Sequence, residues 1–294
     1  MKRMVRMSLL GLFAVSLLAS CNNNGKDKGK DDSFTAKEPE LKEDYVEEAL
    51  GVNMDMVYVK GGIFNMGATS EQEQYAYDNE KPVRTVMLDG FHIGKFEVTQ
   101  AQWTAVMGTT LEEQAGGHSI KGEGDNYPMY YISWNEAQEF CKKLSEATGK
   151  KYVLPTEAQW EYAARGGVHK TKTLYAGSDD LEEVAWYYDN SAVETRRSAH
   201  EVGTKAANAL GLYDMSGNVE EWVSDYYNKS YDEKAILINP QGPSTGDRRV
   251  LRGGSFSDPA KWHRVSSRKE TPSSSDGDDN YEDSSIGFRV VVLP

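Results

Sequence analysis

The chain has 294 residues, of which 38% are hydrophobic and 11% aromatic, enough apolar material for a packed core. Length alone allows one large domain or two small ones. The formal net charge is −13. Nucleic-acid and anionic-membrane binding faces need clustered lysine and arginine. The acidic balance therefore argues against a nucleic-acid partner and favours a soluble, exported surface.

The N-terminus carries a targeting signal. Lys2, Arg3 and Arg6 precede an apolar run over residues 9–18 that ends in Leu-Ala-Ser-Cys at Cys21. A charged start, a short apolar run and small residues before a cut site form a secretory signal, and the run is too short to span a bilayer. The last four residues resemble a bacterial lipobox, in which Cys21 becomes the lipid-bearing first residue. An ordinary cleaved signal with an incidental cysteine is the alternative.

Residues 1–20 are thus expected to be a lipoprotein signal peptide, and lipid on Cys21 is expected to anchor the exported protein to the outer membrane, on its periplasmic face or at the cell surface. Residues 21–51 are highly charged and nearly free of large apolar residues before Tyr45, which predicts a flexible tether. A short helix is expected within it at Glu43–Leu50. No second linker follows, so residues 52–294 are predicted to form one domain.

The first part of that domain is predicted to be β-structure. Residues 57–59 and 63–67 flank Gly61 and Gly62 and predict a strand pair around a glycine turn. Residues 84–99 continue with alternating apolar positions, and the C-terminal run 287–294 is rich in β-branched residues typical of a buried strand.

Two helices are predicted in the middle of the chain. Ser133 with Glu136, and Thr156 with Gln159, have the spacing of capping boxes at helix starts. Cys141 shares one face of the first helix with other apolar residues, so it is expected to be a small buried hydrophobe. Two short helices, an irregular sheet and long loops predict an α+β fold.

Six motifs then occur in order between residues 56 and 291: MVYVKGGIFNMG, FEVTQAQW, SWNEAQEFCKKLSEATGKKYVLPTEAQWEYAARGG, NALGLYDMSGNVEEW, RGGSF and GFRVV. Together they resemble the formylglycine-generating enzyme family, also called sulfatase-modifying factors. The resemblance covers nearly the whole domain. It implies a C-type-lectin-like fold with little regular secondary structure and long ordered loops.

Members with oxidase activity bind Cu(I) through two cysteines just after the Arg-Gly-Gly-Ser turn and oxidise a sulfatase cysteine with oxygen. Soft thiolates are the ligands that select Cu(I). Here Asp258 stands at the first cysteine position, and none of residues 260–263 is the second. Copper is therefore not expected. The resemblance assigns the cleft frame to Arg252, Ser255, Asp258, His263, Arg264, Arg268 and Glu220, the last replacing a tryptophan at the cleft edge.

Two other kinds of metal site come into question. Asp258 and His263 suit Zn(II) or Fe(II), but two ligands with Pro259 between them form at most half a site. The family also has a calcium site, which carries over to the carboxylates of Asp214 and Glu221 and the carbonyls of Gly217 and Val219. Hard oxygen ligands suit a structural Ca²⁺; the alternative is a plain Gly-Asn turn. A second family site would use Asn190 and Ser191, without an evident partner acid.

The missing cysteines predict a protein without formylglycine-generating activity. Family lipoproteins are structural parts of gliding-motility and type IX secretion machinery, so the resemblance implies a binding or scaffolding role beside an unidentified envelope protein. Two alternatives stay open: an oxidoreductase acting on a protein or small molecule by another route, and a glycan-binding module. Aromatic residues that could line a glycan groove, or only pack loops, are Trp186, Tyr187, Tyr188, Tyr226 and Tyr227.

Overall fold

The structure is a computed structural model that describes residues 42–230, 236–271 and 278–294. The signal peptide, Cys21 and most of the expected tether lie outside these residues. Within them, no helix is long and apolar enough to cross a membrane.

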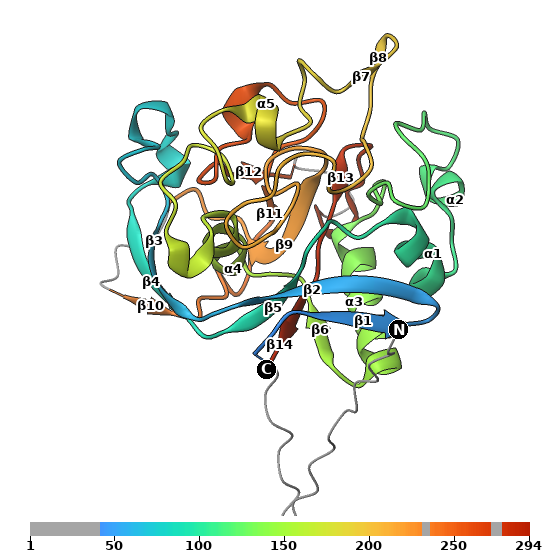
Figure 1. Ribbon diagram of the computed structural model, residues 1–294, viewed down its shortest axis with the longest axis horizontal. Coiled ribbons are helices and arrows are strands. Elements are labelled where there is room, and N and C mark those ends of the chain that lie inside the picture. Colours follow the sequence, from blue (N-terminus) through green and yellow to red (C-terminus); the bar gives the residue numbers. More distant parts are fainter. Residues whose placement is uncertain (1–41, 231–235, 272–277) are drawn as a thin grey trace, which may run out of the picture. The chain divides into compact units, whose positions relative to one another are not determined.

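The described residues form an α+β domain with short helices and curled sheets (Figure 1). The helices are α1 (Gln100–Met107), α2 (Leu111–Ala115), α3 (Trp134–Thr148), α4 (Glu157–Ala164) and α5 (Leu181–Val184). The strands are β1 (Tyr45–Ala49), β2 (Val52–Val59), β3 (Gly62–Met66), β4 (Arg84–Leu88), β5 (Phe91–Gly94), β6 (Lys151–Val153), β7 (Ala192–Val193), β8 (Arg196–Arg197), β9 (Glu220–Tyr226), β10 (Leu237–Ile238), β11 (Arg249–Arg252), β12 (Lys269–Glu270), β13 (Ile286–Gly287) and β14 (Val291–Leu293).

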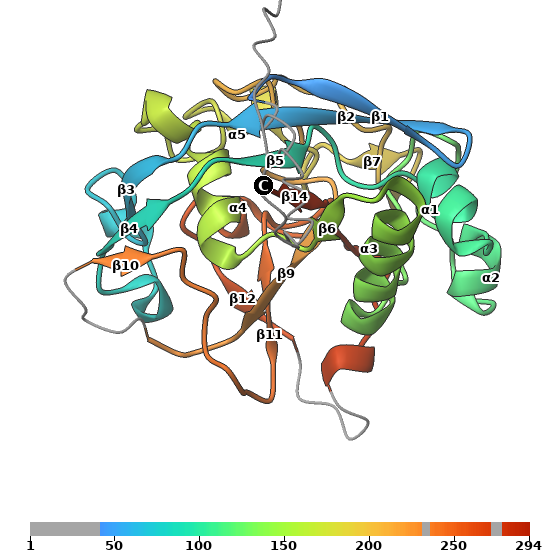
Figure 2. The same cartoon turned by 90° about the horizontal axis from the view of Figure 1, so that it is seen from below.

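The strands form four sheets. The largest has the order β1-β2-β5-β14-β6, a second has β12-β11-β9-β13, a third has β10-β4-β3, and β7 pairs with β8. The β10-β4-β3 sheet lies at one end of the domain and α1, α2 and α3 lie at the other (Figure 2). The sheet containing β9 and β11 lies between them and carries the Arg-Gly-Gly-Ser turn.

Both predicted helix starts are confirmed. The Ser133 hydroxyl accepts from the Glu136 N–H, and the Glu136 carboxylate accepts from the Ser133 N–H. Thr156 and Gln159 exchange the same two bonds at the start of α4. Each pair satisfies two backbone donors that a helix start otherwise leaves open. Helix α3 ends at Gly149, which adopts the left-handed conformation that favours glycine.

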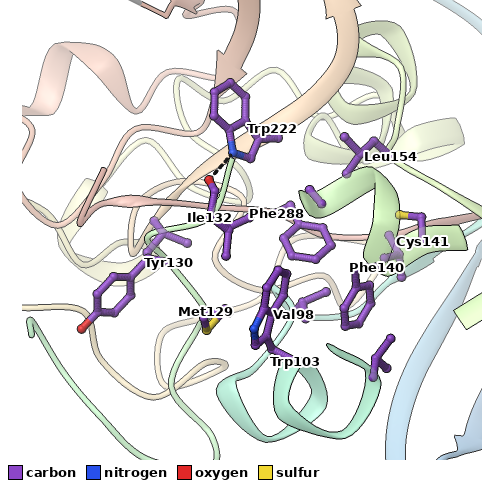
Figure 3. Close-up of a cluster of buried hydrophobic side chains, with 14 of the residues drawn as sticks. Val98, Trp103, Met129, Tyr130, Ile132, Phe140, Cys141, Leu154, Trp222 and Phe288 are labelled. Carbon is purple, nitrogen blue, oxygen red and sulfur yellow. Dashed lines mark hydrogen bonds between the residues drawn. The ribbon is translucent and has the colours of Figure 1, made fainter. Parts of the chain in front are cut away.

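Cys141 is buried in the larger apolar core, as predicted. Beside it the Trp103 ring stacks on Phe140 at a centroid distance of 5.8 Å, and the edge of Phe288 meets both rings (Figure 3). Burial raises the pKa of the Cys141 thiol above its usual range. The side chain is therefore a neutral packing element of the core.

Two local predictions are wrong. The segment expected to be a helix at Glu43–Leu50 instead contains strand β1, which pairs antiparallel with β2. The hydroxyl of Tyr152 donates to Glu47 at 2.6 Å, so contacts distant in sequence override the local preference for helix. Strands β2 and β3 also do not pair with each other: the Gly61-Gly62 segment moves the chain from one sheet to another.

Candidate functional site

The Arg-Gly-Gly-Ser turn follows the end of β11. Gly253 and Gly254 have φ angles of 93° and 72°, the region that favours glycine. A side chain at Gly254 would come within 3.0 Å of the His263 ring and the Trp262 carbonyl. The two glycines therefore let the turn pack tightly against the segment that follows, and Ser255 is fully buried there.

Asp258, at the position expected for the first copper ligand, is already engaged. Its Oδ2 accepts bonds from the Ser255 N–H at 3.0 Å and the Ser255 hydroxyl at 2.6 Å. The Lys269 ammonium contacts Asp258 Oδ1 at 2.7 Å and Glu220 Oε1 at 3.0 Å. We call Asp258, Lys269 and Glu220 the acid–lysine triad. Glu220, which replaces the expected tryptophan, and Asp258 are thus joined by one cation.

Burial governs the charges of the triad. It raises the pKa of Glu220 to about 7, although Lys269 favours the carboxylate. Burial alone would lower the pKa of Lys269, but Glu220 and Asp258 outweigh it and raise that pKa. Lys269 was not found from the sequence, because a lysine between Arg268 and Glu270 carries no distinguishing pattern.

His263 lies beside the triad but is directed elsewhere. Its Nε2 is 3.1 Å from the Ser255 carbonyl, which can accept a hydrogen bond from Nε2–H. Burial lowers the pKa of His263 to about 4, which keeps the ring neutral at pH 7. Among the described residues no group of three or more His, Cys, Asp or Glu side chains is placed to hold a metal ion.

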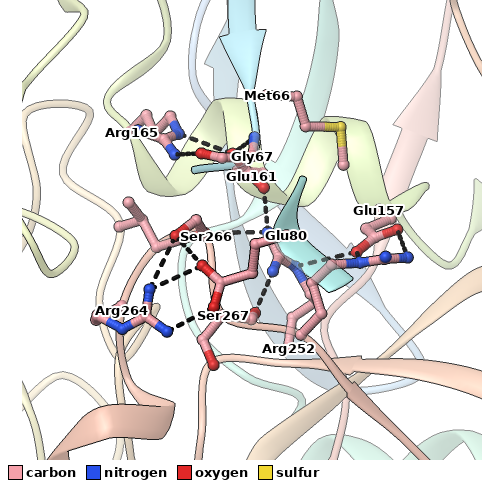
Figure 4. A network of polar contacts seen from close by, with 12 residues as sticks. Met66, Gly67, Glu80, Glu157, Glu161, Arg165, Arg252, Arg264, Ser266 and Ser267 are labelled. Carbon is pink, nitrogen blue, oxygen red and sulfur yellow. Dashed lines mark hydrogen bonds and ion pairs between the residues drawn. The ribbon is translucent and has the colours of Figure 1, made fainter. Parts of the chain in front are cut away.

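The arginines expected in the cleft frame lie in buried ion pairs (Figure 4). Arg252 contacts Glu161, and Arg264 contacts both oxygens of Glu80 at 2.6 and 2.7 Å. Arg268 contacts both oxygens of Glu157. None of the three arginines is more than 2% exposed. Such bidentate pairs hold segments together. The arginines expected to frame the cleft are therefore buried cross-links that join β11 and the segment after it to α4 and to Glu80.

The turn assigned to calcium has two unlike carboxylates. Asp214 Oδ2 accepts from the Gly203 N–H at 2.7 Å, while its buried Oδ1 has no hydrogen-bond partner. Glu221 instead receives bonds on both oxygens from Arg289 and one from the Trp160 indole, all at 2.7–2.9 Å. Three N–H groups thus occupy both oxygens of Glu221, whereas Asp214 has one oxygen without a hydrogen-bond partner.

A third acid at this turn was missed by the sequence analysis. Glu97 accepts from the Asn218 amide at 2.7 Å and the Val219 N–H at 2.9 Å. Burial, then Asp214 and Glu221, raise the pKa of Glu97 well above its usual value, and burial raises that of Asp214 to about 6. Glu97 lies in the FEVTQ motif, but 117 positions separate it from Asp214, so no local spacing could have joined them.

The second expected calcium position is crossed by hydrogen bonds within the protein. The Asn190 side chain donates to Ala185 and Glu182 and accepts from the Tyr187 N–H. The Ser191 carbonyl is 3.0 Å from His200 Nε2. Each of the two oxygens that the resemblance assigns to a cation therefore already accepts one hydrogen bond within the protein.

Most of the candidate glycan-stacking rings have a ring or a cation of the chain itself next to them, although Tyr188 is 44% exposed. Trp186 stacks on His200 at 3.8 Å and has the Lys205 ammonium 4.2 Å from its ring. Arg197 lies 3.2 Å from the Tyr188 ring centroid. The remaining rings are similarly placed: Arg249 lies 3.5 Å from Tyr226, Arg268 lies 5.1 Å from Tyr227, and Tyr187 is buried. These contacts favour packing over sugar stacking.

The fold and the turn motifs define a domain of the C-type-lectin-like sulfatase-modifying class. Residues 42–293 match the sulfatase-modifying factor enzyme 1-like domain. The chain is 32% identical over 292 residues to the formylglycine-generating enzyme of Streptomyces coelicolor, covering 80% of this chain and 88% of that protein. It is 30% identical to the chaperone protein LppX of Paenibacillus barcinonensis, covering 70% and 79% of the two chains.

A solved structure agrees with these sequences. Treponema denticola variable protein 1 superposes with a TM-score of 0.72 at 28% identity, over 85% of this chain and 99% of that one. The chain therefore belongs to the sulfatase-modifying factor family, and it lacks the cysteine pair that the copper oxidases of that family use.

Proposed function

We propose that this protein is a non-catalytic binding domain, exported and anchored by lipid on Cys21, that holds a partner protein in the cell envelope. The observation that carries the proposal is the acid–lysine triad, because Asp258 takes the place of a copper-binding cysteine and is bound to Ser255 and Lys269. The single thiol of the described residues, Cys141, is buried in α3. Nothing in this geometry offers Cu(I) a thiolate.

Two further observations support binding over catalysis. A relative that shares most of its length with this chain is named a chaperone protein, which implies contact with another protein. The net charge of −13 favours protein partners over nucleic acid. Gliding or type IX secretion assemblies in the outer membrane are the setting that the lipoprotein resemblance suggests.

The catalytic reading is tested with a sulfatase-type cysteine peptide under oxygen, with Cu(I), Fe(II) or Ca²⁺ added separately. Mass spectrometry is expected to find no aldehyde with this protein, and to find it with the Streptomyces coelicolor relative as the positive control. Aldehyde formed by this chain would establish the oxidoreductase alternative.

The binding role is tested by crosslinking and pull-down of the full-length protein from its native envelope. A stoichiometric protein partner is expected, together with radiolabelled palmitate on the wild-type chain and none on Cys21→Ser. Absence of any stoichiometric partner would reject the scaffold role. Retention on a polysaccharide array, lost in Trp186→Ala or Tyr226→Ala, would instead establish the glycan alternative.

We also propose calcium as a structural ion at the Asp214 turn, held by the free Oδ1 and the carbonyls of Gly217 and Val219. The buried, unpartnered oxygen of Asp214 supports this, because hard oxygen donors suit Ca²⁺. Glu221 is excluded from the ligand set as long as Arg289 and Trp160 occupy its oxygens.

A further inference from the structure

Strand β3 lies at the outer edge of its sheet. In the sheet β10-β4-β3, β4 lies between the other two strands, so β3 pairs on one side only. The sheet lies at the end of the domain opposite α1 to α3 (Figures 1 and 2). Unpaired strand edges are templates for an additional strand unless proline, charge or a covering segment blocks them, and residues 62–66 contain neither proline nor a charged residue.

Hydrogen-bond alternation identifies which groups face that edge. The Asn239 N–H donates to the Met87 carbonyl at 2.9 Å, so the backbone groups of Met87 point toward β10. The neighbouring β4 residues must then point toward β3. Ile63 and Asn65 lie opposite Met87 and Thr85. Their N–H and C=O groups are therefore directed away from β4, toward the free edge.

A pocket of about 600 Å³ follows this edge. Its lining includes Ile63, Phe64 and Asn65 from β3 and residues 167 and 170–172 from the segment after α4, and among the described residues it includes none of β4. A volume of this size accommodates a few residues or a drug-sized ligand. The backbone donors and acceptors of Ile63 and Asn65 are two residues apart, which is the spacing at which an extended peptide presents its own hydrogen-bonding groups to a neighbouring strand.

The side chains around the pocket select for apolar and acidic groups. Ile63 and Val83 are 48% and 42% exposed at its wall. The exposed Lys170 and Lys172 line the pocket from the segment after α4. Glu71, which also lines the pocket, is paired with Arg165 at 2.7 Å. Glu73 is the remaining acid of the lining, so the lysines are in excess over unpaired carboxylates.

We propose that β3 binds an extended segment of a partner protein as an added strand, with alternate apolar residues over Ile63 and Val83 and acidic residues facing Lys170 and Lys172. This inference rests on the proposed binding role and names the kind of partner segment it needs. Main-chain hydrogen bonds supply affinity in this mode, and the lysines select the sequence.

The first test measures binding of capped peptides to the full-length protein in detergent by isothermal titration. The probe alternates valine with glutamate, and saturable binding is expected. A peptide with lysine in place of glutamate, and one with N-methyl groups on alternate amides, are each expected to bind about tenfold or more weakly. Equal binding of the N-methylated peptide, or no binding of the parent peptide, rejects strand addition.

The second test uses variants of the site. Asn65→Pro removes a donor at the free edge, and we expect roughly two- to tenfold weaker binding. The double variant Lys170→Glu/Lys172→Glu keeps β3 intact and is expected to prefer the lysine peptide. Lys142→Glu on α3 is the matched surface control and should change neither preference. If the double variant keeps the parent preference, the lysines do not select the ligand and the proposal fails.

Two outcomes separate this proposal from others. If the peptide binds only after residues 22–41 are deleted, the chain's own N-terminal segment is the occupant, and partner docking at this edge is rejected. If the envelope partner is captured equally by the wild-type and the Lys170→Glu/Lys172→Glu chains, the binding role stands and the β3 edge is rejected.

Discussion

Lys269 is the residue on which the acid–lysine triad depends, because its single ammonium group contacts two largely buried carboxylates. Lys269→Met would leave Glu220 and Asp258 close together without a cation. Removal of one partner from a buried ion pair is strongly destabilising, and we expect a loss of about 2–4 kcal/mol in the free energy of unfolding, measured with urea.

The matched control is Lys142→Met, since Lys142 contacts Glu139 at the surface at 3.2 Å; this change should cost less than about 1 kcal/mol. Combining Lys269→Met with Glu220→Gln and Asp258→Asn should recover most of the loss, because no uncompensated charge remains. A Lys269→Met protein as stable as the wild type would show that the acid–lysine triad contributes nothing to the free energy of unfolding.

The two acids of the calcium turn should respond differently to substitution. Calcium is expected to raise the Tm of the wild type by about 2–5 °C. Asp214→Asn should abolish that rise, because the asparagine oxygen is held by the Gly203 N–H and an NH2 group takes the place of the free oxygen. Glu221→Gln should lower the Tm with or without calcium, since it leaves Arg289 buried without its carboxylate, yet it should keep the calcium-dependent rise.

Differential scanning calorimetry with calcium or a chelator separates these effects. No calcium-dependent rise in the wild type would reject the ion. A rise lost in Glu221→Gln and kept in Asp214→Asn would assign the ion to Glu221 and contradict the occupation of that carboxylate by Arg289 and Trp160.

At the scale of elements, helices α3 and α4 were predictable because their signals are local. A capping box places both partners within four residues, so Ser133 with Glu136 marks the start whatever the rest of the chain does. Strand partners are not local. Nothing near Gly61 shows that β2 joins β5 while β3 joins β4; sheet assignment depends on which apolar faces meet in the folded domain.

Strand β1 could not be predicted from its local sequence for the same reason. Because it pairs with β2, the folded domain begins before residue 52. We expect deletion of residues 1–41 to leave the Tm unchanged, whereas deletion of residues 1–51 should lower it by about 5–15 °C. The longer deletion removes the β1–β2 ladder and the contact of Glu47 with Tyr152 and Lys150. Thermal melting of the two truncated proteins measures this, and equal Tm values would return residues 42–51 to the tether.

At the scale of the whole molecule, the family and the missing cysteines could be predicted, but the arrangement of the site could not. Asp258 was identified by its position in the motif. Its partner Lys269 and the occupation of Glu221 by Arg289 depend on side-chain directions. The arginines that look like cleft residues in the sequence are buried because acids from distant segments, such as Glu80 and Glu157, reach them.

The same buried acids couple stability to pH. Burial raises the pKa of four of them above their usual values: Glu97, Asp214, Glu220 and Asp225. Each therefore keeps a proton in the folded state that the unfolded chain has released. Such a group contributes stability that is complete below its usual pKa and is lost as the pH rises through the raised pKa. Burial lowers the pKa values of His263 and His200, so these two groups make stability rise with pH. They are two groups against the four acids, so the fall with pH prevails.

Asp225 isolates this effect, because burial and the nearby Glu157 raise its pKa from 3.8 to about 7. Wild-type stability is expected to fall by a few kcal/mol between about pH 4.5 and 7, and urea titrations across that range measure the slope. Asp225→Asn keeps an oxygen to accept the Glu157 N–H, bonded at 2.8 Å in the wild type, but cannot titrate. The variant should therefore show a shallower fall. Stability that rises with pH over this window, or an identical slope in the variant, would mean that Asp225 is already ionised in the folded protein.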